Sequence, residues 1–244
     1  MEERLRSAVV QAAQAAGEYL HRDPRKGANE VEKKCKDLML RTLRSAEPSV
    51  SLWNESPNRN PERAFSVYAL DSCVNFSRGI GPYGSMASYI EEGVPIFGAL
   101  YLPESEQMFV AERGKGARQN GRRIGVNERG SLSKSVVCCE CSSFDEELRP
   151  MSLGVIQRLA KHAMLWRNLG SPAAEYAFLS SGRIDGLVAS LHESGHAAGV
   201  LLMQEAGAVV TDGEGNPFSM HSANIVAASP SVHAELLALV GRAL

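Results

Sequence analysis

The residues His192, Glu193 and His196 fall in the segment HESGH, which has the H-E-x-x-H pattern of zinc peptidases. That chemistry requires a helix, on which two His residues four positions apart share one face and the Glu acts on a zinc-bound water. The fourth residue is Gly195, and glycine is the poorest helix former after proline. The pattern also lies between a strand-like run, GLVAS, and a helical run, AAGVLLMQEAG. The sequence therefore predicts a loop that ends at the start of a helix, which argues against a zinc peptidase.

A second group of reactive side chains is CCEC, at residues 138–141. On a strand, Cys139 and Cys141 point to one face and Cys138 to the other. A metal site there needs further ligands, which the sequence does not supply nearby, so core packing is the favoured role. The chain has five cysteines at irregular spacing, which is typical of free thiols in a reducing cytoplasm.

Composition and charge argue against several classes of function. The net charge of −2 over 244 residues gives no direct signal for a nucleic-acid surface. Apolar runs all fall short of the roughly 20 residues that span a bilayer. The first 20 residues are amphipathic and start with acidic side chains, unlike a signal peptide. We therefore expect a cytoplasmic globular protein without a membrane partner.

Hydrophobic periodicity predicts the elements that position these residues. Leu5, Val9 and Ala12 share a face in a predicted helix at 2–20. Helices are also predicted at 30–45, 151–163, 172–181, 197–206 and 230–243. Strands fill the middle of the chain, with a hairpin turn at Asn120–Gly121, and after about residue 150 strands and helices alternate. This order predicts an α+β part at 1–148 and an α/β part at 149–244, in one compact unit with a pocket between them.

Four segments together resemble the inositol monophosphatase family over nearly the whole chain. They are GALYLPESEQMFVAERGKGARQNGRRIGV, GSPAAEYAFLSSGRIDG, AAGVLLMQEAGAVVTDGEGNPF and NIVAASPSVHAELL. The resemblance implies an α/β fold layered as an αβαβα sandwich, commonly a homodimer. In this family, Mg²⁺ ions held by carboxylates drive the hydrolysis of phosphate monoesters.

The resemblance also implies where the metal carboxylates should fall, and most of these positions carry other residues. The principal metal Glu of a G-E-E loop falls on Asn54, with Glu55 beside it. In the D-P-x-D-G-T strand end the first Asp becomes Tyr68 and the second remains as Asp71. The Asp of a W-D pair falls on Gly195. One carboxylate cannot hold a pair of Mg²⁺ ions, so no metal cofactor is expected unless the family activity is retained. The residual metal candidates are Asp71, Glu55 and Glu32.

Several functions stay open on this basis. The first is a pseudoenzyme that keeps the fold and has lost metal catalysis. The second is a pocket rebuilt for another small molecule, including an anion, in which Ser72 and Cys73 begin a helix. There, His192 or His196 would activate the Cys73 thiol. The tentative catalytic residues are then Asp71, Cys73, His192 and His196, and the ligand-binding residues are Ser72, Cys73, Gly170, Ser171 and Glu193.

Structural roles compete with each of these assignments. Cys73 can be a small buried replacement for Thr, and His196 a packed core residue. A Zn²⁺ or Mn²⁺ site made by Asp71, His192, Glu193 and His196 is a further alternative. So are an active Mg²⁺-dependent phosphatase for a sugar or inositol phosphate and a non-catalytic protein that binds a partner.

Overall fold

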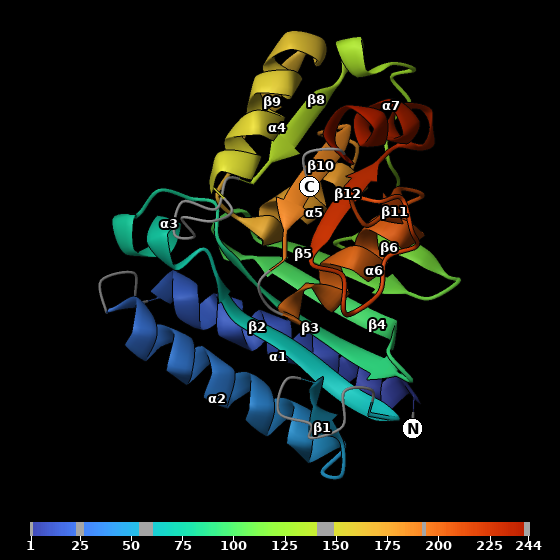
Figure 1. Cartoon of the computed structure of the whole chain (residues 1–244). Helices are drawn as coiled ribbons and strands as arrows, with labels where there is room; N and C mark the ends of the chain where they lie inside the picture. Colours follow the sequence, from blue (N-terminus) through green and yellow to red (C-terminus); the bar gives the residue numbers. More distant parts are fainter. Residues whose placement is uncertain (1, 23–26, 54–60, 141–148, 192–193, 242–244) are drawn as a thin grey trace.

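Five layers of helices and sheets make up the structure, a computed structural model that describes residues 2–22, 27–53, 61–140, 149–191 and 194–241 (Figure 1). The outer layers are helix pairs, α1 (Glu2–Arg22) with α2 (Ala28–Ala46), and α4 (Arg149–His162) with α7 (Pro230–Val240). Two sheets lie inside them and enclose a middle pair, α5 (Pro172–Ser180) and α6 (Ala197–Glu205). This arrangement confirms the predicted αβαβα sandwich.

The first sheet has seven strands in chain order, β1 to β7. Neighbouring strands are antiparallel, except that β1 runs parallel to β2. The strands are β1 (Ser51–Leu52), β2 (Arg63–Asp71), β3 (Gly84–Glu91), β4 (Val94–Leu102), β5 (Gln107–Glu112), β6 (Gly116–Gln119) and β7 (Arg122–Ile124). The predicted turn at Asn120 and Gly121 joins β6 to β7, and both residues have positive φ angles, as a tight hairpin turn requires.

The second sheet has five strands in the order β11-β12-β10-β8-β9. They are β8 (Val136–Cys139), β9 (Leu165–Arg167), β10 (Gly186–Ser190), β11 (Val209–Thr211) and β12 (Asn224–Ala228). β8 belongs to this sheet although it precedes residue 149. The division of the chain at residue 148 therefore stays a prediction about domains, and the sheets themselves divide between β7 and β8.

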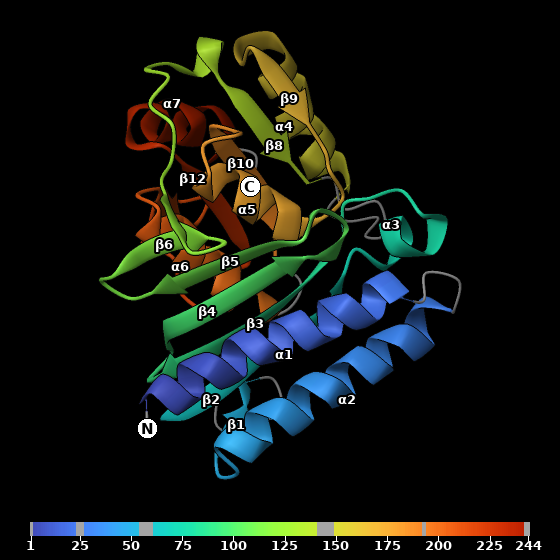
Figure 2. The same ribbon diagram turned by 180° about the vertical axis from the view of Figure 1, so that it is seen from behind.

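The helix faces follow the periodicity of the sequence. In α1 the predicted stripe of Leu5, Val9 and Ala12 is buried. The helix packs on β3 and β4, as Figure 2 shows from the back of the molecule. The middle helices α5 and α6 are buried almost all round because a sheet covers each side of their layer. Among the described helices, none is both long and apolar enough to cross a bilayer.

Candidate functional site

Asp71 ends strand β2 and is fully buried. Its Oδ2 accepts hydrogen bonds from the Ser171 hydroxyl and, at 3.3 Å, from the Ala173 backbone N–H. Burial raises the pKa of Asp71 from 3.8 to about 7, against the opposing effect of the Ser171 hydrogen bond. The structure thus brings two predicted site residues, Asp71 and Ser171, into direct contact.

Ser171 is also the N-cap of helix α5, where its side chain accepts a hydrogen bond from the Ala174 N–H. The preceding Gly170 has φ 63°, a left-handed conformation that turns the chain into the helix. Asn75, on the short helix α3 (Cys73–Arg78), donates 2.9 Å hydrogen bonds to the carbonyls of Pro82 and Leu169. These bonds tie α3 to the Gly170 loop, so the predicted ligand-binding residues at 170–171 lie beside the start of α3.

Ser72 and Cys73 begin helix α3 as predicted, but their geometry is not that of a buried nucleophile. Ser72 is the N-cap with a left-handed φ of 63°, and its side chain makes no capping hydrogen bond. The predicted structural role of Cys73, as a small buried replacement for Thr, is wrong because its side chain is exposed.

The sequence did not predict two further carboxyl groups near Asp71, the buried Glu175 and the half-buried Glu140. Glu175 on α5 is fully buried, and its Oε1 accepts a 3.0 Å hydrogen bond from the Leu169 N–H. Burial raises its pKa from 4.5 to about 8, and the charges of Glu140 and Asp71 raise it further. Burial also raises the pKa of Glu140, just after β8, to about 7. The available signal was a Glu inside the otherwise apolar helix PAAEYAFLS.

These carboxyl groups favour their neutral forms because ionised buried oxygens require partners. In the described part of the chain, Oδ1 of Asp71 and Oε2 of Glu175 are buried without a hydrogen-bond partner. The pKa of Tyr176 is raised well above 10 by burial and by the same three carboxyl groups. A set of acids with raised pKa values therefore lies at the end of β2 and against α5.

Tyr68, Tyr176 and His196 form a cluster next to these acids, here called the aromatic cluster. The His196 ring meets Tyr68 and Tyr176 edge-on, with ring centroids 5.7 and 5.9 Å apart. His196 Nδ1 lies 2.8 Å from the Tyr176 hydroxyl oxygen, and both residues are buried. The sequence predicts that His196 either packs in the core or activates the Cys73 thiol. The structure places it in the core.

Gly195 lies against the aromatic cluster. A Cβ at this position would be 2.9 Å from both Cβ and Cγ of Tyr68, closer than carbon atoms pack. Gly195 belongs to a 3₁₀ turn, Ser194–His196, and α6 begins at Ala197, where the periodicity predicts the helix and two residues after the start implied by the family resemblance. The predicted loop before α6 is thus a short turn at this end, while His192 and Glu193 lie outside the described residues.

Of the remaining predicted metal candidates, only Glu32 lies among the described residues, where no group of three His, Cys, Asp or Glu side chains is placed to hold an ion. Glu55 and Asn54 lie outside the described residues, as does Cys141. Glu32 is on α2, where its charge adds to the effect of burial that raises the pKa of Cys35 to about 12. Cys138 and Cys139 are both buried, which agrees with core packing of the CCEC segment.

The five-layer fold and a strand-end Asp beside a helix N-terminus place the chain in the class of αβαβα phosphatase-like proteins. The chain belongs to the inositol monophosphatase family, whose family model matches residues 1–243. It is 27% identical to an inositol-1-monophosphatase of Mesorhizobium japonicum, covering 98% of this chain and 97% of the relative. It is 26% identical to the Nus factor SuhB of Vibrio cholerae, covering 91% and 90%.

A solved structure of the same family has the same fold. The inositol monophosphatase of Anabaena matches with a TM-score of 0.88 at 27% identity, over 98% of this chain and 94% of that one. The resemblance predicted from sequence motifs is therefore confirmed for the family and the fold.

Proposed function

We propose that this protein is a non-hydrolytic member of the inositol monophosphatase family that acts by binding rather than by metal-dependent phosphate release. The packing of Tyr68 on Gly195 carries the proposal. The family resemblance assigns metal carboxylates to both positions, and neither residue has one. Because a Cβ at residue 195 would lie 2.9 Å from Tyr68, the space for an Asp side chain there is already filled.

The described residues do not fit a pair of Mg²⁺ ions. Mg²⁺ prefers near-octahedral coordination by oxygen, including ionised carboxylates. Asp71 is fully buried, and its Oδ2 already accepts hydrogen bonds from the Ser171 hydroxyl and the Ala173 N–H. Within the residues that the structure describes, no three His, Cys, Asp or Glu side chains are grouped to hold an ion. We therefore assign no step to Mg²⁺.

The proposed ligand of the rebuilt pocket is a small molecule, for which an anion is the favoured class. The absence of a carboxylate at positions 68 and 195 lowers the negative charge of the pocket, and burial, which raises the pKa of Glu175 to about 8, lowers it further near pH 7. Activation of Cys73 by a histidine remains a hypothesis for this pocket. The structure supports it only weakly, since Nδ1 of His196 is already bonded to Tyr176.

A second candidate is a protein-binding role without catalysis. The Vibrio cholerae relative, which matches over 90% of its length, is named Nus factor SuhB rather than phosphatase. A protein-binding role is compatible with the packing of Tyr68 on Gly195, because binding of a partner protein does not use the family pocket. A cytoplasmic location fits either function and stays a prediction.

A homodimer is part of the proposal by family analogy. Large apolar side chains are exposed on α3, α4, the edge strand β9 and the residues beside them. These elements lie on one side of the molecule in Figures 1 and 2. The exposed side chains are Val74, Ile80, Leu153, Met164 and Leu165. Exposed apolar patches of this kind are typical of interfaces between protein chains. Light scattering with Met164→Glu should show a smaller mass than the parent if this face joins two copies.

Calorimetry and a phosphate-release assay test the proposal together. We expect no Mg²⁺ binding in the micromolar range and no Mg²⁺-dependent release of phosphate from inositol-1-phosphate or fructose-1,6-bisphosphate. A relative with intact family motifs, assayed in parallel, verifies the reagents. Mg²⁺-dependent turnover by the unmodified protein that is lost in Asp71→Asn would refute the proposal.

The same phosphate-release assay can be applied to a variant that places carboxylates at the family positions. Combining Asn54→Glu, Tyr68→Asp and Gly195→Asp restores the family carboxylates. Tyr68→Asp removes the ring but keeps the Cβ that lies close to residue 195, so the backbone must still move. We therefore expect little turnover from the triple variant, and strong turnover would show that the turn at 194–196 is more adaptable than its packing indicates.

A further inference from the structure

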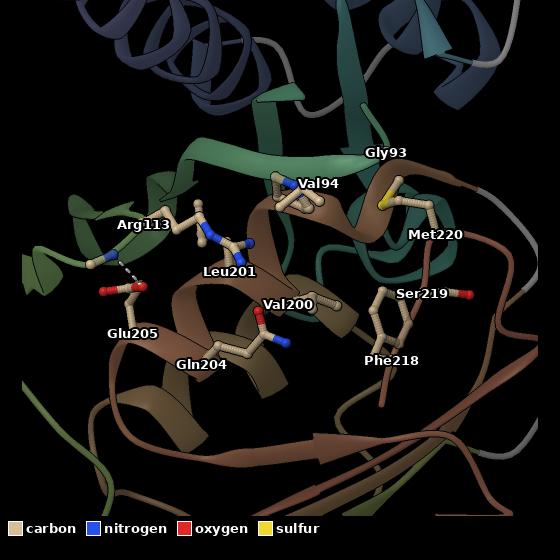
Figure 3. A pocket seen from close by; sticks show the side chains of 12 residues that line it. Gly93, Val94, Arg113, Val200, Leu201, Gln204, Glu205, Phe218, Ser219 and Met220 are labelled. Atoms are coloured by element: carbon tan, nitrogen blue, oxygen red, sulfur yellow. Dashed lines mark hydrogen bonds between the residues drawn. The ribbon is translucent and has the colours of Figure 1, made fainter. Parts of the chain in front are cut away.

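A groove on the surface of α6 shares no lining residue with Asp71 or the aromatic cluster. Its volume is about 550 Å³, within the range of roughly 300–1,000 Å³ that small-molecule sites occupy. Its walls come from the β3–β4 turn, the β5–β6 turn, helix α6 and the loop at 218–220. We call it the hairpin groove (Figure 3).

The hairpin groove has an apolar floor. Val200 and Leu201 of α6 are buried beneath it, and Val94, Phe218 and Met220 are half-buried around it. Figure 3 shows the Phe218 ring on one side of the space and Arg113 on the other, with the Gln204 amide between them. A ligand that enters would therefore cover apolar surface and meet polar groups at the rim.

Arg113 supplies the positive charge of the groove. Within the described part of the chain, its guanidinium forms no ion pair or hydrogen bond, and it points toward the centre of the groove. The nearest lining acid, Glu205, is turned away: its two oxygens accept 2.7 Å hydrogen bonds from the N–H groups of Gly114 and Gly116. The Glu205 charge is thus committed to the hairpin backbone, while that of Arg113 faces the space.

Negative charge on the other side of Arg113 restricts the orientation of an anionic ligand in the hairpin groove. A neighbouring hollow shares Val94 and Arg113 and is lined by three acids, Glu62, Glu91 and Glu92, and by Arg63, which pairs with Glu47. An anion is repelled from that side and attracted to Arg113. The body of an anionic ligand must then extend over α6 toward Phe218.

We propose that the hairpin groove binds a small organic anion with an apolar body, whose charged group pairs with Arg113 and whose body packs on Val200, Leu201 and Phe218. A guanidinium forms strong, directed hydrogen bonds to carboxylate, sulfonate or phosphate oxygens. The apolar floor supplies the remaining affinity through burial of the ligand body. This site does not depend on the function proposed for the family pocket.

The test uses 8-anilinonaphthalene-1-sulfonate, an aromatic anion whose fluorescence rises on binding, and N-phenyl-1-naphthylamine, which lacks the sulfonate. We expect Arg113→Met to weaken binding of the anionic probe about tenfold and to change binding of the neutral probe by less than about twofold. Phe218→Ala should weaken both. Arg122→Met is the matched control, because Arg122 is an exposed arginine on neighbouring β7 outside the groove.

The proposal is overturned if Arg113→Met binds the anionic probe like the parent, or if Arg122→Met loses the same affinity. It is also overturned if neither probe binds while light scattering shows self-association that Arg113→Met abolishes, because a second copy then occupies the groove. Urea unfolding of each variant verifies that it is folded. Added salt should weaken only the anionic probe in the parent, as expected for a charge pair near the surface.

Discussion

Replacement of Glu175 by Gln should remove a large part of the pH dependence of the protein's stability. Glu175 is fully buried, and burial raises its pKa from 4.5 to about 8. Because the folded-state pKa lies above the unfolded value, the folded protein binds a proton that the unfolded chain releases between these two pH values. Its stabilising contribution is therefore complete below about pH 4.5 and is lost as the pH rises through about 8.

The size of the effect follows from the two pKa values. Their separation is about 3.5 pH units, and each unit corresponds to about 1.4 kcal/mol, so the full loss is about 5 kcal/mol. Between pH 5 and pH 8 the loss is about 3.5 kcal/mol. Glutamine keeps the oxygen that accepts from the Leu169 N–H and stays neutral throughout this range. Glu175→Gln should thus be the more stable protein at pH 8, with the difference largely gone at pH 5.

Urea unfolding at pH 5 and pH 8, in buffer with a chelator, measures both stabilities. Glu3→Gln is the control, because Glu3 is an exposed glutamate on α1 and its loss should leave the pH dependence unchanged. If the parent and Glu175→Gln lose stability in parallel between the two pH values, Glu175 is already ionised in the folded protein. The reasoning about the buried carboxyl groups would then be wrong.

Three further changes test other parts of the structure. Gly195→Ala should destabilise the fold by about 1–3 kcal/mol in urea unfolding, because its Cβ overlaps Tyr68. Glu205→Gln should cost about 1–2 kcal/mol, since a single amide oxygen cannot accept from both glycine N–H groups of the hairpin. Alkylation of Cys73 should proceed at the same rate in the parent and in His196→Ala at each pH, because His196 is buried and bonded elsewhere.

Gly154→Ala is the control for Gly195→Ala. Gly154→Ala, at a helical position on α4 where an added Cβ meets nothing within 4 Å, should be neutral or stabilising. Equal stability of both glycine variants would show that Tyr68 moves aside without cost. If Glu205→Gln unfolds at the same urea midpoint as the parent, water replaces the lost hydrogen bond to the Gly114 or Gly116 N–H without cost. Slower alkylation in His196→Ala would support the hypothesis of an activated thiol.

The order of elements could be read from the sequence because it depends on local periodicity. The stripe of Leu5, Val9 and Ala12 repeats every three to four residues, so a helix that buries it is predicted without tertiary information. The turn at Asn120 and Gly121 needs positive φ angles, which these residue types tolerate. The four family segments added the layer order, which periodicity alone does not give.

The candidate site was only partly predictable. The resemblance located Asp71 and Ser171, which the structure joins by a hydrogen bond. It also predicts that Tyr68 and Gly195 stand at positions of metal carboxylates, but as two separate changes. That the Tyr68 ring lies on Gly195 depends on how the 194–196 turn approaches strand β2, and no local pattern encodes that distance.

By itself, the sequence determined the helix faces, the hairpin turn and the family. The tertiary structure alone decided that the charges of Glu140 and Asp71 raise the pKa of Glu175, and that Arg113 faces an apolar groove. These side chains are separated along the chain by tens of residues and come together only when α5 and α6 pack between the two sheets. Sequence periodicity reports which face of an element is buried, whereas the partner on that face is set by the packing of the layers.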